Sequence, residues 1–189
     1  MEMDREYIHY KDLVTTYEGK GIIPYEELLN TVEWREKREK ILKRDDYYCQ
    51  KCGKSETMWH NGFITFNLYK RTFYKQDGER IAVEHPEKSD RPIYLHVHHT
   101  FYILGKLPWD YDDNTLQTLC NWCHWVFHEK EKVPVYAQTA NELKEMNYTP
   151  CKRCNGAGIF PEYKHVQAGL CFRCRGTRYE ELIPNLGGE

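Results

Sequence analysis

Eight cysteines, arranged as four CxxC pairs, limit what this chain of 189 residues can fold into more than any other feature of its sequence. A CxxC turn presents two thiolates to one metal ion, and two such turns complete a tetrahedral zinc site with no open position. Four turns therefore predict two structural zinc ions. The pairs are Cys49/Cys52, Cys120/Cys123, Cys151/Cys154 and Cys171/Cys174.

The spacing of the pairs predicts which of them share an ion. Sixteen residues separate Cys154 from Cys171, within the roughly 15 to 20 residues common between the two turns of a zinc ribbon. The two C-terminal pairs are therefore expected to bind one ion. By elimination, Cys49 and Cys52 join the pair that begins at Cys120, across 67 intervening residues. The first zinc would then connect distant parts of the main domain.

Composition indicates a reducing compartment, which favours metal binding over the alternative of a disulfide framework. The sequence has no apolar run long enough to span a membrane. Its first ten residues, "MEMDREYIHY", are acidic and polar where a secretory signal would be basic and then apolar. We therefore expect a cytoplasmic protein that does not associate with membranes.

Five of the nine histidines lie in two short segments. "YLHVHHTF" contains His96, His98 and His99 at the end of a β-prone apolar run, and "CNWCHWVFH" contains His124 and His128 at helical i, i+4 spacing. Because the neighbouring cysteines already fill a zinc site, the two helical histidines are available to another ion. Clustered neutral imidazoles suit a divalent metal with open positions, and an unligated histidine beside them suits a general base.

The order of these motifs resembles that of the HNH endonucleases, in the subgroup whose core is held by zinc. The resemblance is carried by "CQKCG", "LHVHHTFYILGKLPWDY" and "LQTLCNWCHWVFH", and it covers roughly half the chain, from about Trp34 to His128. It implies an α+β fold with a ββα-metal core, in which two strands and a helix hold one catalytic metal, expected to be Mg²⁺ or Mn²⁺. It also implies that His98, His124 and His128 bind this metal.

The same resemblance implies the chemistry. His99 would be the general base that activates water, and the metal would stabilise the charge that develops on a DNA phosphate and on the departing 3′ oxygen. Asn114 is expected to orient His99, although the family's asparagine commonly lies directly before the leucine of "LxxLC", where this chain has Thr115. Asp112 and Asp113 are alternatives, as orienting groups or oxygen ligands, and a simple polar turn is a further one.

The rest of the chain is expected to surround this core. Apolar residues at helical spacing predict a helix in Thr31 to Cys49, and alternation around "QDGE" predicts a β-hairpin inserted between Cys52 and His98. Two short helices, broken at "GKGIIP", are expected before them. The expected divisions are an N-terminal helical segment (1–33), the HNH nuclease domain (34–132), a linker with room for one short helix (133–150), the zinc ribbon (151–178) and a tail (179–189).

Basic side chains suggest where nucleic acid would bind, in a chain whose formal net charge is −2. A solvated charged face explains the basic residues of the first long helix equally well. The zinc ribbon has six basic residues against one acidic residue, so we expect it to add DNA affinity, to mediate assembly or to be purely structural. The expected contacts are Arg35, Arg38, Lys70, Arg71, Arg173 and Arg175.

Two functions follow from the sequence. The first is a metal-dependent DNA endonuclease of a phage, a restriction system or another bacterial defence system, with RNA as an alternative substrate. The second is a non-catalytic zinc module that binds nucleic acid or protein, with the histidines as core residues or as a third structural metal site. A metal with an open coordination position would indicate the endonuclease, whereas a closed ligand shell would indicate the structural site. The acidic N-terminal segment is expected to pack, to form a homodimer or to bind a protein partner.

Overall fold

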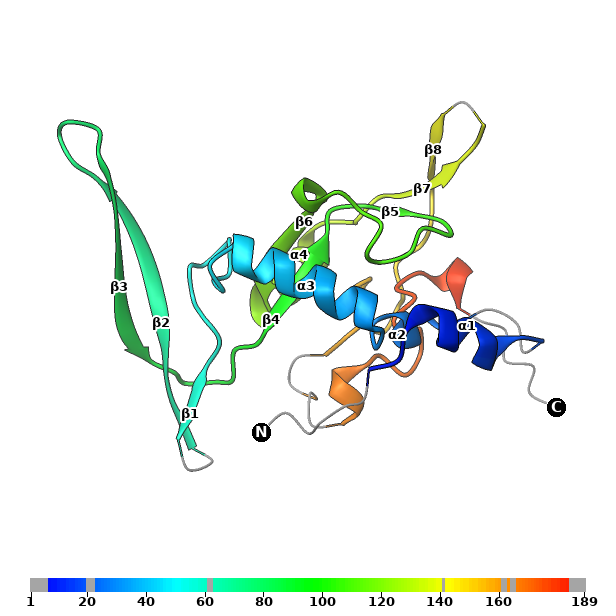
Figure 1. Cartoon of the computed structure of the whole chain (residues 1–189), viewed down its shortest axis with the longest axis horizontal. Helices are drawn as coiled ribbons and strands as arrows, with labels where there is room; N and C mark the ends of the chain where they lie inside the picture. The colour runs from blue at the N-terminus through cyan, green and yellow to red at the C-terminus, as the bar shows by residue number, and fades with distance from the viewer. Residues whose placement is uncertain are drawn as a thin grey trace.

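Four α-helices and three small sheets form a mixed α+β fold in the computed structural model, which describes residues 7–19, 23–60, 63–140, 142–160, 163 and 166–183 (Figure 1). The expectation of an α+β chain with helices at its N-terminus is confirmed. The helices are α1 (Tyr10–Tyr17), α2 (Tyr25–Leu28), α3 (Val32–Arg44) and α4 (Asn121–Lys130).

The three sheets are separate from one another. The first has the order β1-β2-β3, the second pairs β4 with β6, and the third has the order β5-β7-β8. The strands are β1 (Met58–His60), β2 (Phe63–Tyr74), β3 (Arg80–Lys88), β4 (Leu95–His99), β5 (Tyr102–Ile103), β6 (Leu116–Cys120), β7 (Val135–Gln138) and β8 (Leu143–Met146). Short 3₁₀ turns are η1 (Asp113–Thr115), η3 (Gln167–Gly169) and η4 (Glu180–Leu182).

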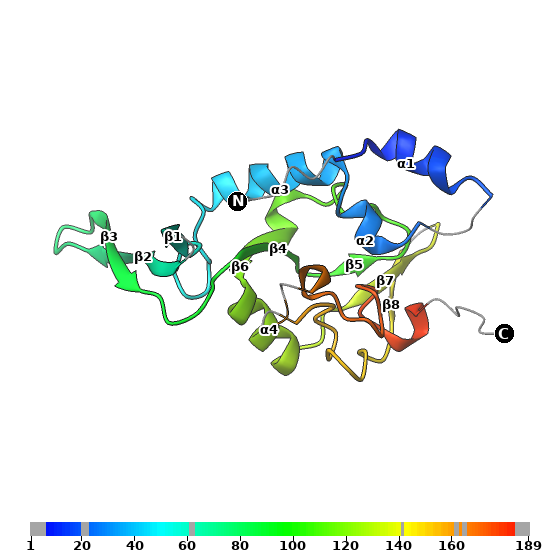
Figure 2. The same ribbon diagram turned by 90° about the horizontal axis from the view of Figure 1, so that it is seen from below.

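The centre of the molecule is the antiparallel pair β4 and β6, with α3 on one side and α4 on the other (Figure 2). Helix α3 begins where the Thr31 hydroxyl accepts a hydrogen bond from the Trp34 N–H at 3.2 Å, a typical N-cap. Its buried side chains, Trp34, Ile41 and Leu42, follow helical spacing and face the strands. The predicted helix is thus confirmed, and it ends at Arg44.

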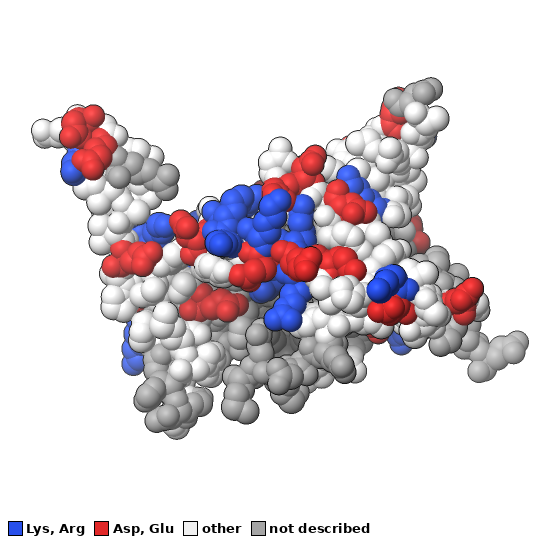
Figure 3. Space-filling view, viewed as in Figure 1, with Lys and Arg blue, Asp and Glu red and all other residues white. Residues whose placement is uncertain are grey.

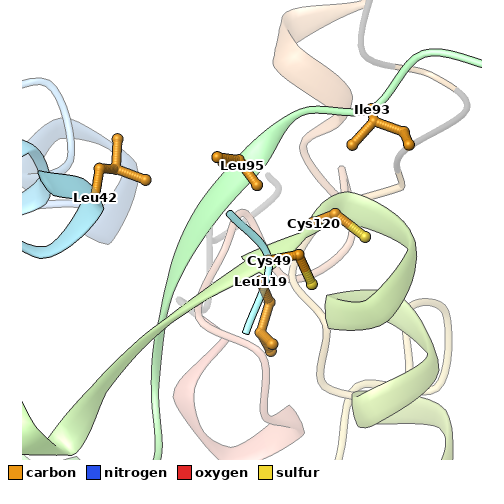
Figure 4. Packing of buried hydrophobic residues seen from close by; sticks show 6 residues of the cluster. All are labelled: Leu42, Cys49, Ile93, Leu95, Leu119 and Cys120. Atoms are coloured by element: carbon orange, nitrogen blue, oxygen red, sulfur yellow. The ribbon is translucent and has the colours of Figure 1, made fainter. Parts of the chain in front are cut away.

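The hydrophobic core continues directly into the first group of cysteines. Leu42, Ile93, Leu95 and Leu119 pack with Cys49 and Cys120 in one buried cluster (Figure 4). Each of the six is less than one tenth exposed. Burial of this apolar surface and the gathering of the thiols therefore support each other.

The predicted hairpin is present and projects away from the rest of the molecule (Figure 1). Strands β2 and β3 pair from Phe66 with Lys88 to Tyr74 with Arg80, and the turn contains Gly78 at φ +84°. At the other end, the hairpin packs on the turn after the first CxxC pair, where the Lys70 N–H donates to the Gly53 carbonyl at 2.9 Å. The hairpin is thereby joined to the first cysteine group.

Residues 133–150, expected to be a linker with a short helix, instead contain strands β7 and β8. β7 pairs in parallel with β5, and Val133 and Val135 are each 1% exposed. The alternating apolar residues of "VPVY" suit a half-buried strand better than a helix. Tyr179, expected to begin the tail, is also buried and donates a hydrogen bond to the Val133 carbonyl. The remainder of the expected tail from 184 onwards lies outside the described residues.

None of the described helices combines the length and the apolar character that crossing a membrane requires.

Replacing Gly53 by alanine should destabilise the protein more than replacing Gly78. Both residues have positive φ, which costs an L-residue about 1 kcal/mol. An alanine Cβ at position 53 would also lie 2.8 Å from the Lys70 carbonyl oxygen, whereas nothing lies within 4 Å of one at position 78. We expect losses in unfolding free energy of about 2 to 4 kcal/mol for Gly53→Ala and about 1 kcal/mol for Gly78→Ala, measured by denaturant titration in zinc-containing buffer. Equal losses would contradict the close packing of hairpin on turn.

Candidate metal centres

The first four cysteines gather as the spacing predicts. Cys49 and Cys52 lie on the loop after α3, Cys120 ends β6, and Cys123 lies in the first turn of α4. Their four sulfur atoms lie within 4.8 Å of one another, and a zinc ion could bind there. The Cys120 sulfur accepts a hydrogen bond from the Cys123 N–H at 3.3 Å, so it also caps α4.

The second group brings Cys151, Cys154, Cys171 and Cys174 together, also within 4.8 Å, and all four are buried. The Cys154 and Cys174 sulfurs are 3.6 Å apart. A hydrogen bond from the Cys154 thiol lowers the pKa of Cys174, which favours the thiolate form that binds a metal. Both predicted cysteine groupings are confirmed as possible zinc sites.

The two CxxC turns of the ribbon repeat the same main-chain pattern. Asn155 donates its N–H to the Cys151 carbonyl, and Arg175 donates to the Cys171 carbonyl, both at 2.7 Å. Each half also bonds to the first cysteine of the other half. The Cys171 N–H donates to the Gly158 carbonyl at 2.9 Å, and the Cys151 N–H donates to the Arg178 carbonyl at 2.8 Å. Gly158 and Arg178 are therefore equivalent positions in the two halves of the ribbon.

Three histidines form a third possible metal site, as predicted. His98 projects from β4, and His124 and His128 project from α4, with nitrogen atoms of all three within 4.8 Å of one another. The Nε2 atoms of His124 and His128 are 3.2 Å apart. Two nitrogens bound to one ion at about 2.0 to 2.1 Å lie roughly 3 to 3.4 Å apart, so this separation fits a shared ligand.

The three imidazoles are buried, and three of their nitrogens have no hydrogen-bond partner among the described residues. Within the described chain, neither nitrogen of His98 nor the Nδ1 of His124 has a partner. Burial, with the nearby charge of Arg178, lowers the pKa of His98 to about 3 and that of His128 to about 2, and burial lowers the pKa of His124 as well. All three rings are thus neutral at neutral pH, the form that binds a metal.

His99 projects from the opposite face of β4, as strand alternation requires. Its ring stacks on Trp34 at 5.3 Å and meets the edge of Tyr111 at 4.7 Å. Its Nε2 lies 3.0 Å from the Pro108 carbonyl oxygen. Because a carbonyl only accepts, Nε2 must carry the proton, and Nδ1 has the free lone pair. Burial lowers the pKa of His99 to about 4, so this lone pair is available at neutral pH.

Asn114 does not occupy the position expected of it. It is exposed on η1, and the partner that orients His99 is the main-chain carbonyl of Pro108. The reason is local: the carbonyl lies in the loop "GKLPWDY", which returns past the ring, whereas η1 faces solvent. Every residue has a main-chain carbonyl, so the sequence motif does not show which carbonyl accepts a hydrogen bond from His99.

Asp113, one of the alternatives to Asn114, is engaged elsewhere. Its carboxylate pairs with Lys37 and Lys40 of α3, each at 2.7 Å. These two lysines lower the pKa of Asp113 to about 2. Asp113 thus holds η1 against α3 and is not directed at the histidines.

A cavity of about 110 Å³ lies between the histidines and the C-terminal ribbon, residues 151–178, which contains the second cysteine group. It is lined by His96, His99 and His124, by residues of α2 and α3, and by Tyr102. The remaining wall belongs to the ribbon, which lies beside α4 (Figure 2). The sequence did not indicate that the ribbon reaches the histidines. Its lining residues are Ala157, Ile159 and Arg178.

The ribbon is attached to α4 by polar and apolar contacts. The Asn155 side chain donates to the main-chain carbonyl of His128 at 3.0 Å. Trp125 packs against the buried cysteines of the ribbon. The segment expected to be a separate module is therefore joined to the helix that carries two of the three clustered histidines.

Most of the expected nucleic-acid contacts lie apart from the cavity. Lys and Arg side chains gather over α3 (Figure 3), and of these Arg38 lines the cavity while donating to the Leu95 carbonyl at 2.9 Å. Arg35 is exposed and lies over the Tyr7 ring. The other expected contacts lie elsewhere: Lys70 pairs with Asp46, Arg71 lies over Tyr69, Arg173 pairs with Glu180, and Arg175 is exposed on the ribbon.

Comparison with known proteins adds no relative: no family model, no curated protein and no solved structure matches this chain.

The native chain should contain two zinc ions held by thiolates, and its eight cysteines should react slowly with a thiol reagent until a strong chelator is added. Cys49→Ser should remove one ion and lower the melting temperature, because Cys49 lies in the core cluster. Cys171→Ser should remove the other ion. Elemental analysis and thiol titration measure both, with His85→Ala as a control that retains two ions. Rapid reaction of four thiols in the native protein would contradict the assignment.

Proposed function

We propose that this protein is a metal-dependent endonuclease of the HNH type, which hydrolyses phosphodiester bonds in DNA. The observation that carries the proposal is the gathering of His98, His124 and His128 close to His99, whose proton position is set by a carbonyl. Both nitrogens of His98 and the Nδ1 of His124 lack partners in the described chain. Neutral ligand nitrogens next to a base with a free lone pair are what metal-assisted hydrolysis needs.

The order of the elements supports the same proposal. β4 and β6 pair antiparallel, and α4 follows β6 without a loop. This is the strand, strand, helix order of a ββα-metal core, and the candidate ligands come from the first strand and the helix. The four-cysteine group at the junction of β6 and α4 corresponds to the structural zinc of the subgroup that the sequence resembles.

The donor set suits some divalent ions better than others. Imidazole nitrogen suits Mn²⁺, Co²⁺, Ni²⁺ and Zn²⁺ more than Mg²⁺, which prefers oxygen ligands. We therefore favour Mn²⁺ or a later transition ion over Mg²⁺. When bound by His98, His124 and His128, such an ion would supply positive charge to the phosphate and to the departing oxygen.

His99 performs the proton transfer in this proposal. Its Nδ1 accepts a proton from the attacking water, while the Pro108 carbonyl and the stacked Trp34 ring keep the imidazole in place. Holding the base in one tautomer and one orientation avoids the cost of ordering it during the reaction. Strand alternation puts His98 and His99 on different faces of β4, and because β4 ends at His99, the ligand and the base can flank one phosphate at the end of the strand.

A second candidate is a non-catalytic protein in which the three-histidine group is a third structural metal site. The observation that favours it is burial: His98, His124 and His128 are only 1% to 5% exposed. A closed ligand shell would then replace the open positions that hydrolysis requires.

Cleavage assays separate the two candidates. Wild type should cleave supercoiled plasmid or single-stranded DNA with Mn²⁺, Co²⁺ or Ni²⁺, and less with Mg²⁺. His99→Ala should lower the rate about 100- to 10,000-fold, the usual contribution of a general base. His85→Ala is the matched control, because His85 lies on the β3 hairpin strand beside Tyr69.

The cleavage rates are compared only among variants whose zinc content and folding equal those of wild type. RNA is assayed in parallel, because the bond that is broken has the same chemistry. Wild type that cleaves none of these substrates with any of the ions, while it retains its zinc, would favour the structural site. A His99→Ala variant as active as wild type would remove His99 from the mechanism.

A further inference from the structure

Arg178 has a main-chain conformation that an arginine adopts only at a cost. Its φ is +72°, in the left-handed region that favours glycine. The equivalent residue in the other half of the ribbon is Gly158, at φ +76°. The two halves of the ribbon have the same main-chain hydrogen bonds, yet one half has a glycine at this position and the other has an arginine. Strain of this kind persists only where the surrounding structure holds it, and such residues are frequent at functional sites.

The Arg178 side chain points into the histidine cavity. Its guanidinium lies 4.8 Å from the ring centres of both Tyr25 and Tyr102, and one terminal nitrogen donates to the Gly176 carbonyl at 3.1 Å. Its Nε is sealed from solvent and has no hydrogen-bond partner among the residues that the structure describes. The aromatic rings hold the group in place without using that N–H.

The cavity contains positive charge without a matching anion. No acidic side chain of the described chain lines it, and none of the ion pairs among the described residues includes Arg178. Arg38 lines the same cavity from α3. An N–H of a guanidinium that is sealed from solvent without a partner costs free energy unless an acceptor accompanies it. The Nε of Arg178 is in this position, so together with the charge of Arg38 it indicates an anionic ligand.

The size of the cavity limits the ligand. Its volume of about 110 Å³ corresponds to roughly four water molecules. A tetrahedral phosphate group fits this space. A guanidinium presents parallel N–H groups that match two oxygens of a phosphate, which makes phosphate the anion that this geometry favours.

We propose that Arg178 of the zinc ribbon binds a phosphate group of the substrate in the histidine cavity, where Arg38 also contributes positive charge. The inference rests on the proposed function and deepens it, because it identifies the residue that positions the scissile phosphate next to His99. The ribbon is then part of the active site, and its zinc holds Arg178 at the cavity.

Titration of the zinc-replete full chain with inorganic phosphate tests this without any need for cleavage. Wild type should bind phosphate, and the Nε–H signal of Arg178 should shift in the NMR spectrum. Arg178→Gln and Arg178→Gly should bind roughly 10- to 100-fold more weakly, the loss expected for a charged hydrogen bond. Arg178→Gly suits the positive φ and should fold. Arg178→Lys keeps the charge and should give an intermediate affinity.

The matched control is Arg153→Gln, which should bind phosphate as wild type does. Arg153 also lies on the ribbon, over Phe160 and Phe172, but outside the cavity. Failure of wild type to bind phosphate, an unshifted Nε–H signal, or wild-type affinity in folded Arg178→Gly would overturn the proposal.

A short DNA oligonucleotide separates this inference from the nuclease proposal. If wild type cleaves it, the Arg178 variants should lose kcat/KM by about the same factor as they lose phosphate affinity. If wild type binds phosphate through Arg178 but cleaves no nucleic acid, the anion site stands and the nuclease proposal fails.

Discussion

The arrangement of the molecule depends on the four thiols that join the loop after α3 to the junction of β6 and α4. Cys120 ends β6, caps α4 with its sulfur, and lies in the buried cluster with Cys49. One metal ion bound there would set the start and direction of α4 relative to the sheet. His124 and His128 follow on the next turns, so their distance from His98 is a consequence of that junction. A lost thiol would therefore affect the histidine group as well as the core.

The second cysteine group has a similar effect on the other side of the cavity. Its ribbon is attached to α4 through the Asn155 side chain and the packing of Trp125, and to β7 through Tyr179. These attachments place Arg178 opposite the histidines. Two small four-cysteine groups thus do what a larger hydrophobic core would do elsewhere, since the described residues form only modest apolar clusters to hold the layers together.

The cavity and the three-histidine group, which have His124 in common, bring together two kinds of buried group that are costly when left alone. Neutral imidazoles with free lone pairs need a cation, and the guanidinium of Arg178 needs an anion. A divalent ion beside a phosphate would satisfy both, and either ligand alone would satisfy one. The left-handed conformation of Arg178, where the equivalent position is Gly158, adds to the free energy that folding must supply to keep this arrangement.

The sequence by itself determined the features that depend on local spacing. CxxC turns predicted both cysteine groups, i, i+4 spacing placed His124 and His128 on one helical face, and alternation around "QDGE" predicted the hairpin. Only the tertiary structure decided that the Pro108 carbonyl orients His99, that residues 133–150 contain strands, and that Arg178 reaches the histidines. Metal-ligand spacing and side-chain periodicity can be recognised from one continuous stretch of sequence. A main-chain carbonyl has no residue type, and the approach of two distant segments depends on how all the layers between them pack.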